Sequence, residues 1–253
     1  KIKVRREKMK RVIALLLALC LSLSMAACGS SKKAEEESIA AQNAAKEKGK
    51  EIYTLLTDAY NKVDEIGGSV YGVWAKNVSS AKRREIQTDP VKVLLPATKL
   101  SREDFRWGIF CALAESASEN QTKDEILDLV HNATEEEIAQ FDSITDEDLG
   151  ALFVACSDMV KFSVLSVQDA YYLNGGIEFA QTALESAKEA IKEVADMDVQ
   201  PEGIESLKSI YVATSSYLDF CLNTEGSVLQ AADKINGFTT TVKTAMAELE
   251  LVY

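Results

Sequence analysis

The stretch IYTLLTDAYNKVDEIGGSVYGVWAKNV, residues 52–78, decides the fold class. Its apolar and small side chains recur at alternating steps of four and three residues, which places them on one face of an α-helix. This stripe contains Ile52, Leu56, Ala59, Val63, Ile66, Val70, Val73 and Asn77. We therefore predict one long helix over about residues 36–83, interrupted only by Gly67-Gly68.

Two more stripes with the same spacing follow downstream. One runs over residues 149–191 across Gly175-Gly176, and the other runs over residues 207–249 and passes through residues 223–226. We predict that each is one long helix. Glycine near the middle of each long helix either lets neighbouring helices approach closely, kinks or breaks them in one layer of the bundle, or opens a ligand cleft there.

Shorter helices are predicted between the long ones. Residues 102–131 have a helix-start signature at Ser101, with an acidic residue three positions later, and an apolar face that begins at Phe105, although a break near Asn120 is possible. The same signature recurs in the pairs Thr134–Glu137 and Thr145–Asp148. A short helix is therefore predicted just before the stripe that begins at Leu149.

Two prolines, Pro90 and Pro96, interrupt residues 88–100. Because proline lacks the amide donor and disfavours helix in the residue before it, we predict a connecting loop there. Alternating β-branched runs joined by tight turns, the sign of strands, are nearly absent. The sequence predicts an all-α protein, an elongated antiparallel bundle of about four main helices that is on the order of 70 Å long.

The N-terminal segment has the pattern of an export signal. An apolar run over residues 12–23 follows Lys10 and Arg11, and it is shorter than the roughly 20 residues that span a bilayer. Met9 is the natural start of such a signal, so residues 1–8 lie upstream of it.

The motif Met25-Ala26-Ala27-Cys28-Gly29 resembles the lipobox of bacterial lipoproteins, with methionine where that family usually has leucine. The resemblance implies that the Cys28 thiol receives a diacylglyceryl group and that cleavage makes Cys28 the first mature residue. Two acyl chains anchor a protein stably, here at the outer face of the cytoplasmic membrane. The chain then divides into a signal peptide (1–27), a tether (28–36) and a helical bundle domain (37–253). The alternative is a secretory signal that is cut elsewhere.

The leader resembles that of lipoproteins from Gram-positive, Firmicutes-like bacteria. The body is similar to a loose group of helical lipoproteins from such bacteria, through residues 52–78 and through YLDFCLNTEGSVLQAADKIN, residues 217–236. Some phage superinfection-exclusion lipoproteins have a similar anchor and helical exterior domain. None of these resemblances implies a catalytic residue.

The chain is acidic, with 28 Lys and Arg against 40 Asp and Glu and a net charge of −12 at pH 7. The leader holds seven of the basic residues and one of the acidic residues, so 21 and 39 remain after it, a net charge of −18. Nucleic acid and anionic lipid both attract basic surfaces, so we predict neither as a direct contact of the domain. An acidic surface favours basic partners or divalent cations, or serves solubility alone.

Residue types that carry catalysis or hold metals are scarce. His131 is the one histidine of the chain, so the pair of Glu-x-x-His motifs of a di-iron bundle and the zinc peptidase motif are both excluded. A nucleophile elbow and a glycine-rich phosphate loop are missing from the sequence as well. We therefore predict no catalytic residue, no metal site and no cofactor.

Three cysteines, Cys111, Cys156 and Cys221, lie in the helical bundle domain. Their number is odd, and two of them fall on the apolar stripes, where cysteine behaves as a small apolar side chain. We predict three buried free thiols rather than a disulfide.

Trp107 is the strongest candidate for contact with a partner, because it lies off the apolar face that begins at Phe105. It either packs on a second buried face or forms an exposed aromatic anchor. Tyr71 and Tyr172, beside the glycine pairs, are further candidates of this kind. The sequence predicts a non-enzymatic, membrane-tethered binding or scaffold module with an envelope protein or peptide as its partner. The alternatives are a bundle that senses a small molecule or cation, and a superinfection-exclusion lipoprotein.

Overall fold

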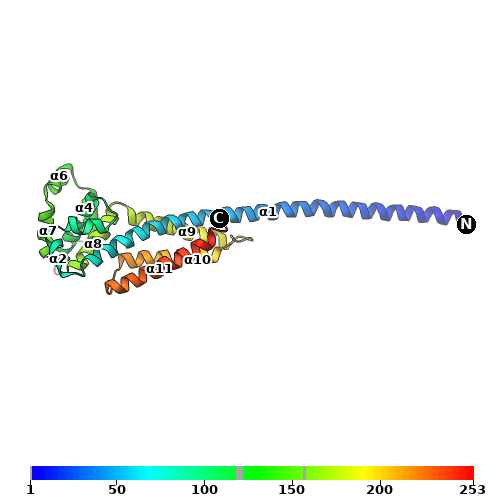
Figure 1. Cartoon of the computed structure of the whole chain (residues 1–253). Helices are drawn as coiled ribbons and strands as arrows, with labels where there is room; N and C mark the ends of the chain where they lie inside the picture. Colours follow the sequence, from blue (N-terminus) through cyan, green and yellow to red (C-terminus); the bar gives the residue numbers. More distant parts are fainter. Residues whose placement is uncertain (1, 118–121, 156–157) are drawn as a thin grey trace.

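The structure of the protein, a computed structural model, describes residues 2–117, 122–155 and 158–253 (Figure 1). These residues are all-α, which confirms the predicted fold class, but they divide into more helices than the four main ones that we predicted. The helices are α1 (Ile2–Lys76), α2 (Ser80–Thr88), α3 (Pro90–Leu94), a 3-10 turn (Leu95–Ala97), α4 (Arg102–Ala117), α5 (Lys123–His131), α6 (Glu135–Ser143), α7 (Asp146–Ala155), α8 (Met159–Leu173), α9 (Gly176–Ala195), α10 (Ile204–Leu222) and α11 (Val228–Leu249).

The longest helix, α1, is the axis of the molecule. All eight positions of its predicted stripe, from Ile52 to Asn77, are at most 1% exposed. The helix continues through Gly67-Gly68 and ends at Lys76, before the predicted end at residue 83. Figure 1 shows its N-terminal part projecting away from all the other helices. Among the described residues, no helix combines the length and the apolar character that crossing a membrane requires.

Three helices pack along α1 to form the bundle. Each of α9, α10 and α11 contacts α1, and α10 also contacts the other two. Successive helices run in opposite directions (Figure 1). The buried face of α9 is rich in alanine, at positions Ala180, Ala183, Ala187 and Ala190. Such small side chains let α9 approach α1 closely, because the distance between packed helices depends on the side chains at the contact.

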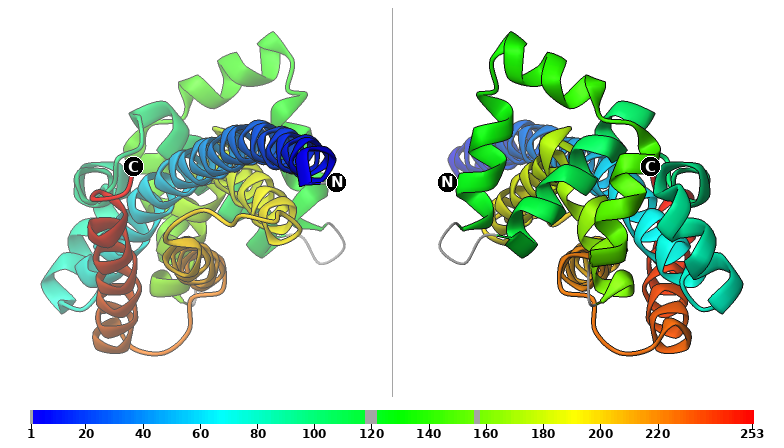
Figure 2. Two further views of the ribbon diagram at one scale, coloured as in Figure 1. Left: turned by 90° about the vertical axis from the view of Figure 1, so that its right-hand side faces the viewer. Right: turned by 90° about the vertical axis from the view of Figure 1, so that its left-hand side faces the viewer.

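Helices α2 to α8 gather at the end of α1 that is opposite to its N-terminus, and we call this group the head (Figures 1 and 2). Here α4 packs against α8, α5 contacts both of them, and α2 and α3 contact α7. Figure 2 shows α6 as an arm that stands off from the rest of the head. The arrangement of α4, α5 and α6 determines the candidate site below.

Residues 90–97 are helical and not the loop that their prolines predicted, whereas residues 89 and 98–100 lie outside any helix, as predicted. Pro90 is the first residue of α3, where a missing amide donor costs no hydrogen bond, and Asp89 caps this helix by accepting a 2.8 Å hydrogen bond from the Lys92 backbone N–H. Pro96 lies in the 3-10 turn. The prediction was wrong because the rule against proline holds for helix interiors and not for helix starts.

The two later stripes are also not continuous helices. Gly175 has a φ of 74°, in the left-handed region that favours glycine, and it separates α8 from α9. After this break Ile177 and Leu184 of the stripe are buried, whereas Gln181, which the four-three spacing also places on it, is exposed and Ala180 is buried instead. Gly226, with a φ of 98°, lies between α10 and α11. Because Gly67 stays inside its helix, the three glycine sites do not share one structural role.

The predicted helix starts are confirmed. The Asp104 backbone N–H donates to the Ser101 hydroxyl at 3.0 Å, and reciprocal side-chain and backbone bonds join Thr134 with Glu137 and Thr145 with Asp148. The region over 102–131 divides into α4 and α5, and the break expected near Asn120 falls outside the described residues.

Two of the three predicted free thiols are also confirmed. Cys111 and Cys221 are buried and form no disulfide, and burial raises the pKa of both thiols. Cys156 lies outside the described residues. A raised pKa keeps a thiol protonated and unreactive, so these two cysteines are core residues.

Candidate binding groove in the head

An apolar groove of about 400 Å³ lies between α4, α5 and α6. Its lining includes Trp107 and Phe110 from α4, Leu129 and Val130 from α5, and Phe141 from α6. The groove opens to solvent, because the Leu129 side chain is 61% exposed and the Phe110 side chain is 37% exposed. Apolar side chains of this size left accessible in one concave place are typical of a binding surface.

Three aromatic rings form one wall of the groove. The Trp107 ring stacks on the Phe141 ring with 3.9 Å between centroids and 26° between planes. Phe110 meets both rings edge-on, at 5.9 Å from Trp107 and 5.5 Å from Phe141. Stacked and edge-to-face pairs hold their rings in place, so this wall offers rigid apolar area that a partner need not order on binding.

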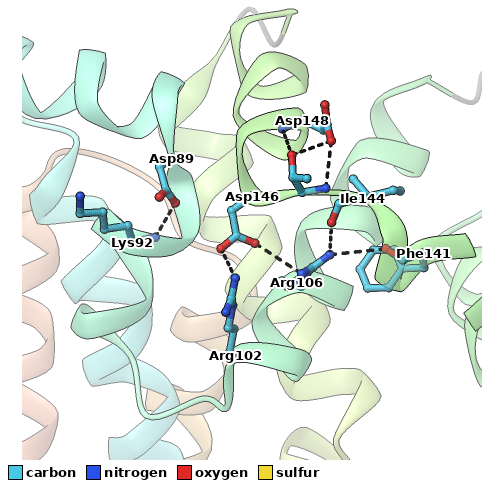
Figure 3. A network of polar contacts seen from close by, with 9 residues as sticks. Asp89, Lys92, Arg102, Arg106, Phe141, Ile144, Asp146 and Asp148 are labelled. Atoms are coloured by element: carbon cyan, nitrogen blue, oxygen red, sulfur yellow. Dashed lines mark hydrogen bonds and ion pairs between the residues drawn. The ribbon is translucent and has the colours of Figure 1, made fainter. Parts of the chain in front are cut away.

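Arg106 fixes α6 against α4 (Figure 3). Its Nη2 atom donates hydrogen bonds to the backbone carbonyl oxygens of Ile144 and Phe141, at the C-terminal end of α6. Its Nη1 atom lies 3.5 Å from the Asp146 carboxylate, which also pairs with Arg102. A cation complements the unpaired carbonyls at the end of a helix, so Arg106 holds the segment that carries Phe141 in place.

A buried ion pair ties α5 to α8. The Lys123 ammonium lies 2.6 Å from Oδ1 of Asp169, whose side chain is 0% exposed, and 4.5 Å from the centre of the Tyr172 ring. Asp169 Oδ2 has no hydrogen-bond partner among the described residues. Burial raises the pKa of Asp169 to about 7, although Lys123 acts in the opposite direction. Helix α5 thus begins at a residue whose partner ionises near neutral pH.

The three aromatic candidates from the sequence do not come together. Trp107 is half-buried and lines the groove, whereas Tyr172 lies on α8 beneath Lys123, and Tyr71 packs against the core from α1. His131 is exposed, and its Nε2 atom lies 3.3 Å from the Leu173 carbonyl oxygen. Cys28 falls within α1, in the part of the helix whose side chains are not described.

Sequence reasoning missed Phe110, Leu129 and Phe141. A signal for Leu129 was available, since α5 has four apolar residues among five consecutive positions, Ile126 to Val130, which is too many for one narrow face. Ile126 and Leu127 are buried and Val130 packs partly against them, so Leu129 is the apolar side chain of α5 that faces outward from the core.

Comparisons with protein families, with curated proteins and with solved structures give no match to this chain. Within residues 2–117, 122–155 and 158–253, no group of three or more His, Cys, Asp or Glu side chains is placed to hold a metal ion.

Proposed function

We propose that the protein is a membrane-anchored, extracytoplasmic binding module, without catalytic activity, that holds a protein or peptide of the cell envelope in the groove of its head. The observation that carries this proposal is the position of the aromatic groove at the end of α1 remote from the N-terminus. From Cys28 to Lys76, a helix with a rise of ~1.5 Å per residue is about 70 Å long. An anchor at Cys28 would present the groove well away from the lipid surface.

Charge and tethering both support this function. The net charge of −18 after the leader keeps the domain from lying on anionic headgroups. An anchor also confines the groove to a thin shell around the cell, where a weak contact gains effective concentration. The groove can then bind its partner even when the intrinsic affinity between them is low.

Site-specific cross-linking in intact cells tests the groove as the contact surface. We expect a photoreactive residue at Leu129 to give a discrete cross-linked protein, because this exposed side chain lines the groove. The matched control is Leu229 of α11, a 74% exposed leucine outside the groove. Equal cross-linking at the two positions, or none at Leu129, would contradict the proposal.

A second prediction concerns the anchor. Cys28→Ala is expected to abolish labelling by an alkyne fatty acid and to release the protein from the membrane fraction, because the thiol is the proposed attachment atom. Cys20→Ala, in the apolar run of the leader, is the control and should leave labelling unchanged. Persistent labelling and membrane retention of Cys28→Ala would refute the location.

The size of the groove favours one alternative function. Its volume of about 400 Å³ falls within the range of small-molecule sites, so a sensor of a small apolar ligand is the second candidate. Such a ligand would protect Leu129 from cross-linking to any protein, which separates the two functions in the same experiment.

A further inference from the structure

Two of the helices that form the groove, α5 and α6, are strongly acidic. Residues 123–143, which span α5 and α6, contain seven acidic residues and one lysine, a net charge of −6 with His131 neutral. All seven carboxylates are exposed, and we call them the rim: Asp124, Glu125, Asp128, Glu135, Glu136, Glu137 and Asp142. Helices α5 and α6 place apolar side chains and the Glu137 carboxylate in the lining of the groove, and they carry the other six rim carboxylates on their exposed surface.

The basic side chains nearest the groove along α4 and α5 already form ion pairs within the protein. Lys123 pairs with the buried Asp169, and Arg106 binds Asp146 and the carbonyls at the end of α6. The Thr134 backbone N–H and hydroxyl hold the pKa of Glu137 below its usual range, so this lining carboxylate stays ionised. Glu137 thus keeps its negative charge at neutral pH.

We propose that the groove binds a basic amphipathic helix of a partner protein, with apolar side chains in the groove and Lys or Arg side chains on the rim. This rests on the groove being the contact surface. Charge complementarity selects the partner, since a second copy of this chain would bring the same acidic rim and an anionic lipid surface would be repelled. A helix fits better than an extended peptide, because the described residues contain no strand edge to extend.

The first test uses designed peptides of about four helical turns. One peptide places Leu at i, i+3, i+4 and i+7 with Lys at the other positions, and its twin replaces every Lys with Glu. Binding to the full lipidated chain in zwitterionic nanodiscs is measured by fluorescence anisotropy, with empty nanodiscs as the blank. We expect the Lys peptide to bind at least tenfold more tightly than the Glu peptide, and its affinity to fall with added salt.

Two pairs of variants locate the binding. One triple variant neutralises three rim carboxylates through Asp128→Asn, Glu136→Gln and Asp142→Asn. We expect it to bind the Lys peptide about tenfold more weakly. The control neutralises three exposed carboxylates outside the head, Glu178→Gln, Asp233→Asn and Glu250→Gln, which changes the net charge equally. Leu129→Ser is likewise expected to weaken binding about tenfold, whereas Leu229→Ser on α11 leaves it unchanged.

The outcomes separate this proposal from the proposed function. If both peptides bind equally and both depend on Leu129, the groove remains the contact surface but the basic partner is refuted. If neither peptide binds while Leu129 still cross-links to a protein in cells, the basic helix is refuted as well. If the Lys peptide binds equally to the natural chain, the rim variant and Leu129→Ser, the assigned binding site is wrong. If phosphatidylglycerol vesicles bind to the rim, the argument from charge is wrong.

Discussion

Gly108→Ala is expected to lower the free energy of unfolding by about 3 kcal/mol, because overpacking of rigid neighbours is costly. A Cβ atom at Gly108 of α4 would lie 2.0 Å from the Ser166 backbone carbonyl oxygen and 2.9 Å from the Ala170 backbone nitrogen, both in α8. Backbone atoms cannot rotate away as a flexible side chain can, so the two helices must separate. The gain in helix propensity, about 1 kcal/mol, does not offset this.

Gly68→Ala is the matched control for this variant. Gly68 is exposed near the C-terminal end of α1, inside the helix, and no described atom outside its own helix turn lies within 4 Å of an added Cβ. We expect this variant to be more stable than the natural chain by about 1 kcal/mol. Urea unfolding followed by circular dichroism measures both changes. A Gly108→Ala protein as stable as the natural chain would show that α4 and α8 are not in backbone contact.

Gly108 also connects stability to the groove, since it lies next to Trp107 in α4. Separation of α4 from α8 would move the aromatic wall relative to α5, which is tied to α8 through Lys123 and Asp169. A variant with reduced stability should therefore bind the Lys peptide less tightly than the Gly68→Ala control does.

The parts of the fold that were predictable from sequence are those decided by local physics. The stripe from Ile52 to Asn77 is buried at every position, because helical periodicity alone determines which side chains share a face. The capping pairs also formed as predicted, since a hydroxyl and a carboxylate three residues apart satisfy each other's backbone donors.

Helix breaks were not predictable, because packing partners decide them. The same dipeptide, Gly-Gly, lies inside α1 at Gly67-Gly68 and ends α8 at Gly175-Gly176. In α1 the chain on both sides belongs to one continuous buried stripe, whereas at Gly175 the chain turns to a left-handed φ before α9 begins. The local preference of glycine permits both a continuous helix and a break. The sequence alone therefore did not reveal the break at Gly175.

The sequence identified one residue of the candidate site, but it did not predict how the residues of the site are arranged. Trp107 was identified because it lies off the apolar face of α4. Its stacking partner Phe141 belongs to α6, which is separated from α4 in the sequence by the whole of α5. Asp169 gave no signal, since an acid beside an apolar stripe usually points to solvent. In the structure it is buried beside Lys123, and this pair has a consequence for stability.

Asp169→Asn is expected to be more stable than the natural chain, and this advantage should be about 2–3 kcal/mol larger at about pH 8 than near pH 5. The folded pKa of Asp169 is about 7, raised above the ordinary carboxyl value by burial. Between those two pKa values the folded state keeps a proton that the unfolded state has lost. The stabilisation from this proton is complete below the ordinary value and is lost as the pH rises through about 7, and an amide has no such loss.

The charged and titratable groups that face Asp169 determine the control. Lys123 favours the ionised carboxylate, while Glu115 disfavours it and Cys111 stays protonated with a pKa of about 12. Lys123→Met removes the favourable charge, so it should raise the pKa of Asp169 further and move the loss of stability to higher pH. In the double variant Lys123→Met, Asp169→Asn, this shift of the stability loss to higher pH should be absent.

Urea unfolding of these variants at several pH values measures the effect, with differences from the natural chain used to cancel the other carboxylates. Parallel stability profiles for the natural chain and Asp169→Asn would show that this carboxyl does not ionise in the neutral range.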